Sequence, residues 1–167
     1  MILTRTEILK RIRAGELKIT PFDPTSVGPA SIDLSLDKRI RVFDEQNVSV
    51  IDELIDYKAI TRVVNISRGY ILKPGVLVLG ITKETVTLPG NLCGWINSRS
   101  RFARIGLMSH IAAPFISPGV SNKQVLEIFN AGNHPINLVP GVKICHLVLQ
   151  ECKGSATYKG KFRKQTL

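Results

Sequence analysis

The stretch Leu72–Pro89, LKPGVLVLGITKETVTLP, decides the class of fold. Pro74-Gly75 marks a turn, and the β-branched residues of Val76–Thr82 and Thr85–Leu88 are typical of two short strands. The same pattern recurs along the chain in Ser31–Leu36, Arg39–Phe43, Val125–Asn130 and Val142–Leu149. Because no amphipathic helices lie between these runs, they predict an all-β sandwich, jelly roll or distorted barrel rather than a parallel α/β sheet.

Two segments depart from the strand pattern. Near the N-terminus, Thr4 and Glu7 have capping-box spacing, an apolar stripe follows, and Gly15 stands where a C-terminal cap belongs, so one short helix is expected. The stretch RSRFARIG, Arg99–Gly106, predicts one helical insertion of about two turns.

The bulk properties predict a single domain over residues 1–167. A chain of 167 residues that is 44% hydrophobic can bury one sizeable core. No apolar run reaches the roughly 18 to 20 residues of a membrane span, and the charged start lacks a secretory signal, so we expect a cytoplasmic protein without a membrane partner. Cys93, Cys145 and Cys152 have no C-x-x-C spacing, which argues against a disulfide framework or structural zinc.

The net charge of +10 makes a polyanion the natural partner, either nucleic acid or a nucleoside triphosphate. Part of the excess lies after Cys152, in a tail that carries Lys159, Lys161, Arg163 and Lys164 without a balancing acid. Such a tail is more often solvated and mobile than functional.

Basic residues also crowd one internal turn, within GWINSRSRFARIGLMSH, Gly94–His110: Arg99, Ser100, Arg101 and Arg104. Guanidinium groups and backbone amides at a helix start suit a triphosphate. A solvated basic turn explains the same residues equally well.

A carboxylate interrupts the apolar run VLEIF, where Glu127 lies between Leu126 and Ile128. Strand alternation favours a solvent-facing position. If Glu127 is instead held in a pocket, it is a candidate general acid–base.

These two stretches resemble one family. SRSRFARIGLMSH, Ser98–His110, is similar to the dCTP deaminase signature GRSSLARLGLxxH, and IAAPFISPGVSNKQVLEIFNAG, Ile111–Gly132, resembles its continuation xxAxxIDPGWxGxxxLEFxNxG. The likeness spans the chain in order, because further motifs resemble family blocks at Gly28–Leu36, Leu72–Pro89, Asn137–Leu149 and Tyr158–Phe162.

The resemblance implies the distorted jelly-roll or barrel of trimeric dUTPases, with active sites shared between neighbouring chains of a homotrimer. It implies hydrolysis of dCTP to dUTP and ammonia, with Mg²⁺ bound through the triphosphate and dTTP as an inhibitor of some relatives. The H-x-E…P-C-x-x-C signature of zinc deaminases is absent from the sequence, so no zinc is expected.

The resemblance also implies residue roles. Glu127 would shuttle the proton of the attacking water, Ser100 and the Ala113 carbonyl would orient that water, and Arg104 would stabilise the charge of Glu127. The substrate-binding set would contain Arg99 and Arg101 on the triphosphate, together with His110, Ser117, Val125, Tyr158, Lys161 and Gln165. Residues from about 153 to 167 would form a mobile basic lid.

Three positions depart from the family pattern. Ser117 replaces the aspartate of IDPG, which weakens sugar discrimination and dUTPase chemistry. Arg101 stands where a serine is usual, and Lys161 stands where the lid has glutamine.

Three hypotheses follow. The first is a dCTP deaminase, with or without dUTP diphosphatase activity, and Glu127 favours it. The second is a dUTP diphosphatase, for which Asp33 would have to replace the carboxylate missing at Ser117. The third, a basic nucleic-acid-binding β module, is disfavoured by an aromatic content of only 6%.

Overall fold

The computed structural model describes residues 1–44, 51 and 55–167. This part of the chain contains eleven strands: β1 (Lys18–Thr20), β2 (Ile32–Phe43), β3 (Thr61–Asn65), β4 (Tyr70–Leu72), β5 (Leu77–Thr87), β6 (Leu92–Ser98), β7 (Leu107–Met108), β8 (Phe115–Ile116), β9 (Ser121–Asn130), β10 (Ile136–Leu138) and β11 (Lys143–Glu151). The helical elements are short: α1 (Arg5–Arg13), α2 (Ser100–Ala103), and the 3₁₀ turns η1 (Pro24–Ser26), η2 (Tyr57–Ile60) and η3 (Lys161–Lys164).

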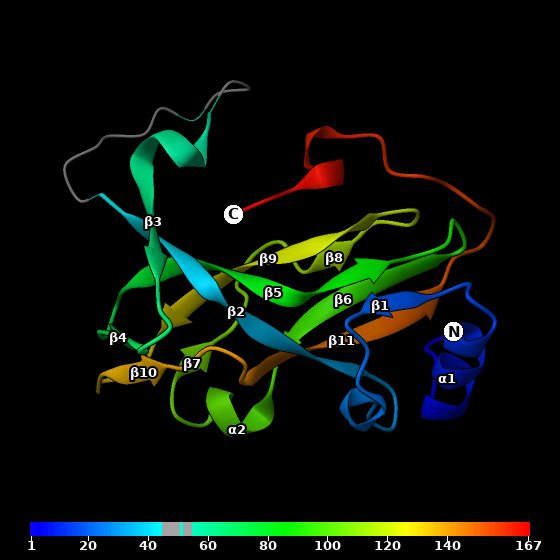
Figure 1. The fold of residues 1–167 in the computed structure, drawn as a ribbon, viewed down its shortest axis with the longest axis horizontal. Coiled ribbons are helices and arrows are strands. Elements are labelled where there is room, and N and C mark those ends of the chain that lie inside the picture. The colour runs from blue at the N-terminus through cyan, green and yellow to red at the C-terminus, as the bar shows by residue number, and fades with distance from the viewer. Residues whose placement is uncertain (45–50, 52–54) are drawn as a thin grey trace.

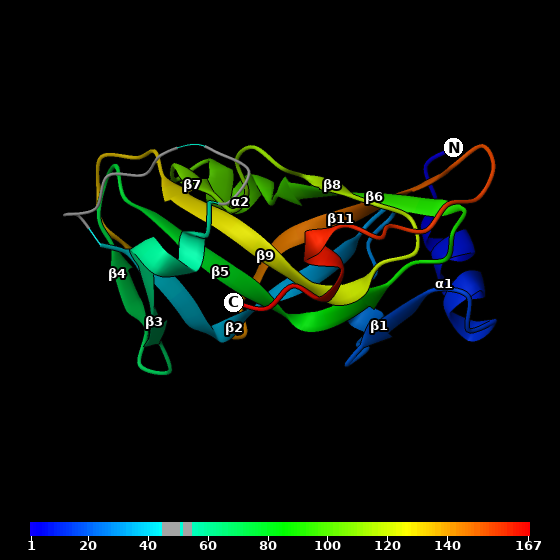
Figure 2. The ribbon, with the colours of Figure 1, turned by 90° about the horizontal axis from the view of Figure 1, so that it is seen from above.

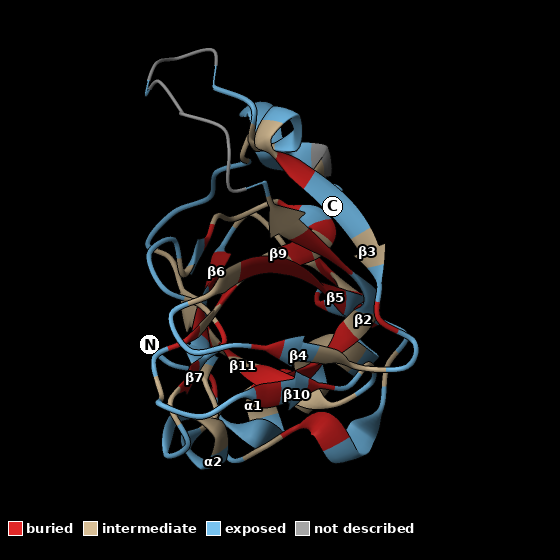
Figure 3. Ribbon diagram, turned by 90° about the vertical axis from the view of Figure 1, so that its left-hand side faces the viewer, coloured by how far each residue is buried: buried red, intermediate tan, exposed pale blue. Residues whose placement is uncertain are grey.

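Nine of the strands form one antiparallel sheet in the order β7-β9-β5-β2-β11-β6-β8, with β1 on β5 and β3 on β2. The long strand β2 joins the two halves, since Ile32–Ser35 pairs with β11 and Leu36–Val42 pairs with β5. The sheet curls around its apolar face, as Figure 3 shows in end view. Strands β4 and β10 pair separately, and Figure 3 places them at that end of the curled sheet.

This architecture confirms the predicted all-β fold class. The runs predicted as separate strands are continuous: β2 and β5 each contain two predicted runs, joined through register shifts at Leu36/Ile40 and Ile81/Thr85. A bulge lets a strand bend without ending, which a pattern of apolar runs does not reveal.

The predicted helices exist but are smaller or differently capped. Thr4 is the N-cap residue of α1, yet its side chain makes no capping hydrogen bond, so the capping box is wrong. Gly15 follows the helix at φ +73°, as expected for a C-terminal glycine. The insertion at Ser100–Ala103 is a single turn, which is shorter than the two turns predicted.

The core lies inside the curled sheet and collects the alternate residues of its strands. Ile32, Leu34, Leu126, Ile128 and Leu147 are all fully buried there. Among the described helices, none has the length and apolar character required to span a membrane.

Candidate active site

A cavity of about 740 Å³ opens on the outer face of β5 and β9. Its remaining walls are the segment 110–117, the C-terminal segment 158–165 and three single residues, Phe43, Tyr57 and Val120. The C-terminal segment crosses the sheet above β9 (Figure 1). Most predicted site residues of this half of the chain line it: His110, Ala113, Ser117, Val125, Glu127, Tyr158 and Gln165.

Glu127 lies in this cavity as a half-buried residue of β9. Its Oε2 accepts hydrogen bonds from the amide nitrogens of Ala112 at 2.6 Å and Ile111 at 3.3 Å. Strand alternation correctly places Glu127 on the face opposite the core. That face is covered by the 110–117 segment and the C-terminal segment, so the pocket interpretation holds rather than the solvent-facing one.

His110 is tied to the same strand. Its Nδ1 accepts a hydrogen bond from the backbone amide of Glu127 at 3.3 Å, so Nε2 carries the proton when the ring is neutral. In the described part of the chain, Nε2 is buried and has no partner.

Two buried polar residues of β9 were missed by sequence reasoning. Asn122 and Gln124 line the cavity, and the side-chain amide of Gln124 donates to Asn122 Oδ1 at 2.6 Å. Both occupy alternate positions that become apolar further along the strand, at Leu126 and Ile128. Polar residues in the apolar register of a strand were the available signal.

The C-terminal segment is bound to the rim of the cavity by hydrogen bonds to backbone carbonyls. The amide of Tyr158 donates to the carbonyl of Pro118 at 2.9 Å, and the Gln165 side chain donates to the carbonyl of Lys123 at 2.9 Å. Gly119 has φ +74°, and a Cβ there would lie 2.8 Å from the Cα of Thr157, so only glycine permits this approach. Lys161 is exposed and lies outside the cavity lining, with its amine 3.4 Å from the carbonyl of Ile55.

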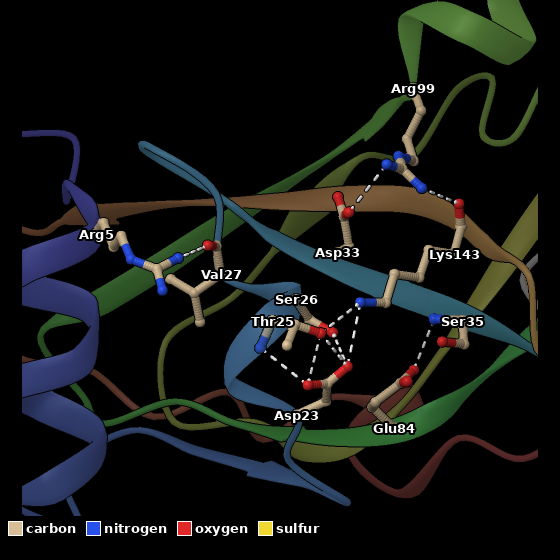
Figure 4. A network of polar contacts seen from close by, with 10 residues as sticks. All are labelled: Arg5, Asp23, Thr25, Ser26, Val27, Asp33, Ser35, Glu84, Arg99 and Lys143. Carbon is tan, nitrogen blue, oxygen red and sulfur yellow. Dashed lines mark hydrogen bonds and ion pairs between the residues drawn. The ribbon is translucent and has the colours of Figure 1, made fainter.

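The predicted phosphate-binding turn lies elsewhere. Arg99 forms an ion pair with Asp33 at 3.1 Å and donates to the carbonyl of Lys143 at 2.8 Å, as Figure 4 shows. Ser100, Arg101 and Arg104 are exposed, and none of them lines the cavity.

One chain therefore does not bring the predicted site together. Figures 1 and 2 show α2 and the C-terminal segment at different faces of the sheet. The group around Glu127 and the group around Arg99 are each well placed within the fold, but they do not meet within a single copy.

The cavity offers few side-chain ligands for a metal ion. Glu127 is the cavity's one acidic residue among those described, and its Oε2 is already engaged by two amides. The described residues contain no cluster of three His, Cys, Asp or Glu side chains able to hold a metal ion. Binding of Mg²⁺ through the triphosphate stays a prediction.

The cysteines belong to the packing of the sheet. Burial raises the pKa of the Cys93 thiol to about 11, and burial also raises the pKa of Cys145. Both thiols therefore remain protonated at neutral pH and behave as small apolar side chains.

Comparison with known proteins identifies the class. The model of the dCTP deaminase-like family matches residues 2–152, and the chain belongs to this family. A relative from Corynebacterium efficiens, named "dCTP deaminase, dUMP-forming", is 40% identical over 151 residues, which cover 89% of this chain and 78% of the relative. A protein of the same name from Nocardioides sp. is 37% identical over 174 residues, which cover 99% of this chain and 91% of that relative.

A solved structure shows the same fold. The crystal structure of 2′-deoxycytidine 5′-triphosphate deaminase from Agrobacterium tumefaciens superposes with a TM-score of 0.68 at 23% sequence identity. The match covers 89% of this chain and 47% of that chain, so this chain spans about half the length of the solved protein.

Proposed function

We propose that this protein catalyses the zinc-independent hydrolytic deamination of dCTP. The observation that carries the proposal is the position of Glu127, a carboxylate in a sizeable cavity beside Ala113, in a chain of the dCTP deaminase-like family. The anchored carboxylate supports a role as general base, since a base must be fixed within hydrogen-bonding reach of the water that it activates.

In the proposed reaction, Glu127 takes a proton from water while the water oxygen bonds to C4 of the cytosine. Glu127 passes this proton to N3. It then transfers the proton of the new C4 hydroxyl to the exocyclic amine, the C4–N bond breaks, and ammonia leaves. The base becomes uracil, so dCTP and water yield dUTP and ammonia. The carbonyl of Ala113 would orient the water, because the amide beside it already holds Glu127.

The triphosphate would be bound by a neighbouring copy of the chain. The turn that carries Arg99, Ser100, Arg101 and Arg104 lies outside the cavity of its own chain. In a homotrimer, the turn of one copy would reach the cavity of the next, where Arg99 and Arg101 would bring positive charge to the phosphates. Ser100 and Arg104 of the same turn would stand beside Glu127, to orient the water and to stabilise the carboxylate. Because its substrate would be a free nucleotide with bound Mg²⁺, the proposal places the enzyme in the cytoplasm.

The second candidate function is formation of dUMP by an additional removal of pyrophosphate. The names of the relatives from Corynebacterium efficiens and Nocardioides sp. favour this product over dUTP. Ser117 lines the cavity without supplying a carboxylate. Asp33 lies 3.1 Å from Arg99, so it would accompany the phosphate-binding turn and is the candidate base for the second step.

Separate incubations with dCTP and with dUTP, each with Mg²⁺, test both proposals. Ammonia from dCTP supports deamination, and pyrophosphate from either nucleotide supports the second step. The variant Asp33→Asn should then lose pyrophosphate release selectively. Pyrophosphate from dUTP with no ammonia from dCTP would overturn the deaminase assignment.

A further inference from the structure

The 3₁₀ turn η2 contacts the C-terminal segment although the two are far apart in sequence. The hydroxyl of Tyr57 donates to the backbone carbonyl of Thr166 at 2.9 Å. The amine of the next residue, Lys58, donates to Thr166 Oγ1 at 3.2 Å. Figure 1 shows the C-terminal segment between η2 and β9.

The neighbouring Leu167 is packed against the sheet. Its side chain is buried with Leu79 and Ile81 of β5, and Val125 of β9 packs against the same cluster. Leu79 and Val125 also line the cavity that contains Glu127. The apolar cluster around Leu167, which is called its seat below, therefore shares the side chains of Leu79 and Val125 with the wall of the cavity.

A buried arginine packs against the ring of Tyr57. Arg41 of β2 is only 9% exposed, and its guanidinium lies 5.7 Å from the centre of the Tyr57 ring. Arg41 also donates to the carbonyl and hydroxyl of Thr61 at 3.1 and 3.0 Å, and the Thr61 hydroxyl donates to the carbonyl of Tyr57 at 2.6 Å. These contacts fix the turn, and with it the position from which the Tyr57 hydroxyl donates to Thr166.

We propose that Tyr57 is a positioning residue for the C-terminal segment: together with the seat of Leu167, it holds residues 158–167 across the cavity. Tyr158, Phe162 and Gln165 of this segment line the cavity, and the Asn122 side chain donates to the carbonyl of Phe162 at 3.0 Å. The Tyr57 ring lines the cavity as well, but its hydroxyl is bonded to Thr166, so in the proposal this hydroxyl acts on a substrate through the segment. This role rests on the proposed function for its kinetic consequence, but the anchoring itself does not.

Hydrogen–deuterium exchange tests the anchoring without any reference to catalysis. In Tyr57→Phe, which removes only the hydroxyl, and in Leu167→Ala, we expect amides of residues 158–167 to exchange about 2- to 10-fold faster, as for the loss of one net hydrogen bond. Amides of β5 and β9 should keep the exchange rates of the unmodified protein. Leu167→Met should restore slow exchange in the segment, because it refills the apolar seat.

Steady-state kinetics with dCTP tests the positioning role. For Tyr57→Phe we expect the KM for dCTP to rise by about 2- to 10-fold, with a smaller change in kcat, because closure of the segment contributes to substrate binding. Tyr70→Phe is the matched control, since Tyr70 packs against the core from β4 and does not line this cavity. It should leave both constants unchanged.

The outcomes separate the two claims. If exchange in 158–167 is unchanged in both variants, or rises equally throughout the core strands, the anchoring proposal is wrong. If the segment loosens but the KM for dCTP does not change, the positioning role is wrong. If the unmodified protein releases no ammonia from dCTP, the proposed function fails while the exchange result still decides the anchoring.

Discussion

Glu127 Oε2 lies 2.6 Å from the amide nitrogen of Ala112, a contact that joins strand β9 to the segment carrying Ala113. A second bond at 3.3 Å, from the amide of Ile111 to the same oxygen, fixes this relationship further. The proposed base and the carbonyl proposed to orient water are therefore positioned by one local structure. This arrangement makes the proposed chemistry sensitive to small changes at Glu127.

The variant Glu127→Gln should abolish deamination while nucleotide binding is kept. Glutamine can still accept the amide hydrogen bonds through its carbonyl oxygen, but it cannot take the proton of water. We expect the rate of ammonia release to fall by about 10²- to 10⁴-fold, with dCTP binding measured by calorimetry within a few-fold of the unmodified protein.

Glu16→Gln is the matched control, because Glu16 is an exposed carboxylate in the turn after α1, away from the cavity lining. It should retain full activity. Deamination by Glu127→Gln at a rate within about tenfold of the unmodified protein would remove Glu127 from the proposed mechanism.

The sequence predicts the β fold well, because that fold depends on local patterns. It also names residues that line one cavity, while their roles in catalysis and binding stay predictions. Turn signals and apolar runs mark the strands, and the family motif marks Glu127, His110 and Ala113. The pattern does not reveal that β2 and β5 run through bulges, since a bulge depends on pairing with a distant strand. The short strands β7 and β8 are likewise set by their partners rather than by their own residues.

The C-terminal segment shows where composition misleads. Its lysines and arginines predict a solvated tail, and the mobility of this segment stays a prediction. Nevertheless, Leu167 is buried, and Tyr158 and Gln165 line the cavity. Long-range contacts with Tyr57 and Asn122 join the segment to the rest of the fold, and no local pattern in residues 153–167 encodes them.

Mixing two inactive variants tests whether sites are shared between chains. Glu127→Gln and Arg104→Ala should each be inactive alone. After unfolding together in equal amounts and refolding, each mixed trimer would hold one site that combines an intact Glu127 with an intact Arg104 from a neighbour, which is about a quarter of all sites in the mixture. Recovery of about that share of ammonia release is expected. Absence of any recovery, with mixed trimers demonstrated by mass spectrometry, would place the whole site within one chain.

Chelators should distinguish a requirement for Mg²⁺ from a requirement for zinc. EDTA should lower the rate of deamination sharply and added Mg²⁺ should restore it, because the triphosphate needs its charge screened. A zinc-selective chelator should have no effect on the rate. Elemental analysis that finds one tightly bound zinc per chain would contradict the zinc-independent mechanism.

The core beneath Glu127 should be sensitive to truncation. Leu126 is fully buried on the face of β9 opposite Glu127. Leu126→Ala should lower the free energy of unfolding by about 2–5 kcal/mol through lost burial and a residual cavity. The comparison is Val63→Ala on β3, where the side chain is 49% exposed and little change is expected. Equal denaturation midpoints for the two variants would contradict the assigned core.

The most direct test of the central claim follows the oxygen atom of the attacking water. The protein is incubated with dCTP and Mg²⁺ in water labelled with the heavy isotope of oxygen, and the nucleotide products are analysed by mass spectrometry. Deamination through Glu127 predicts heavy oxygen at C4 of the uracil ring, with one ammonia released per labelled base. Heavy oxygen in a phosphate group as well would reveal the second, dUMP-forming step. Unlabelled cytosine recovered intact, with label only in phosphate, would contradict the deaminase account.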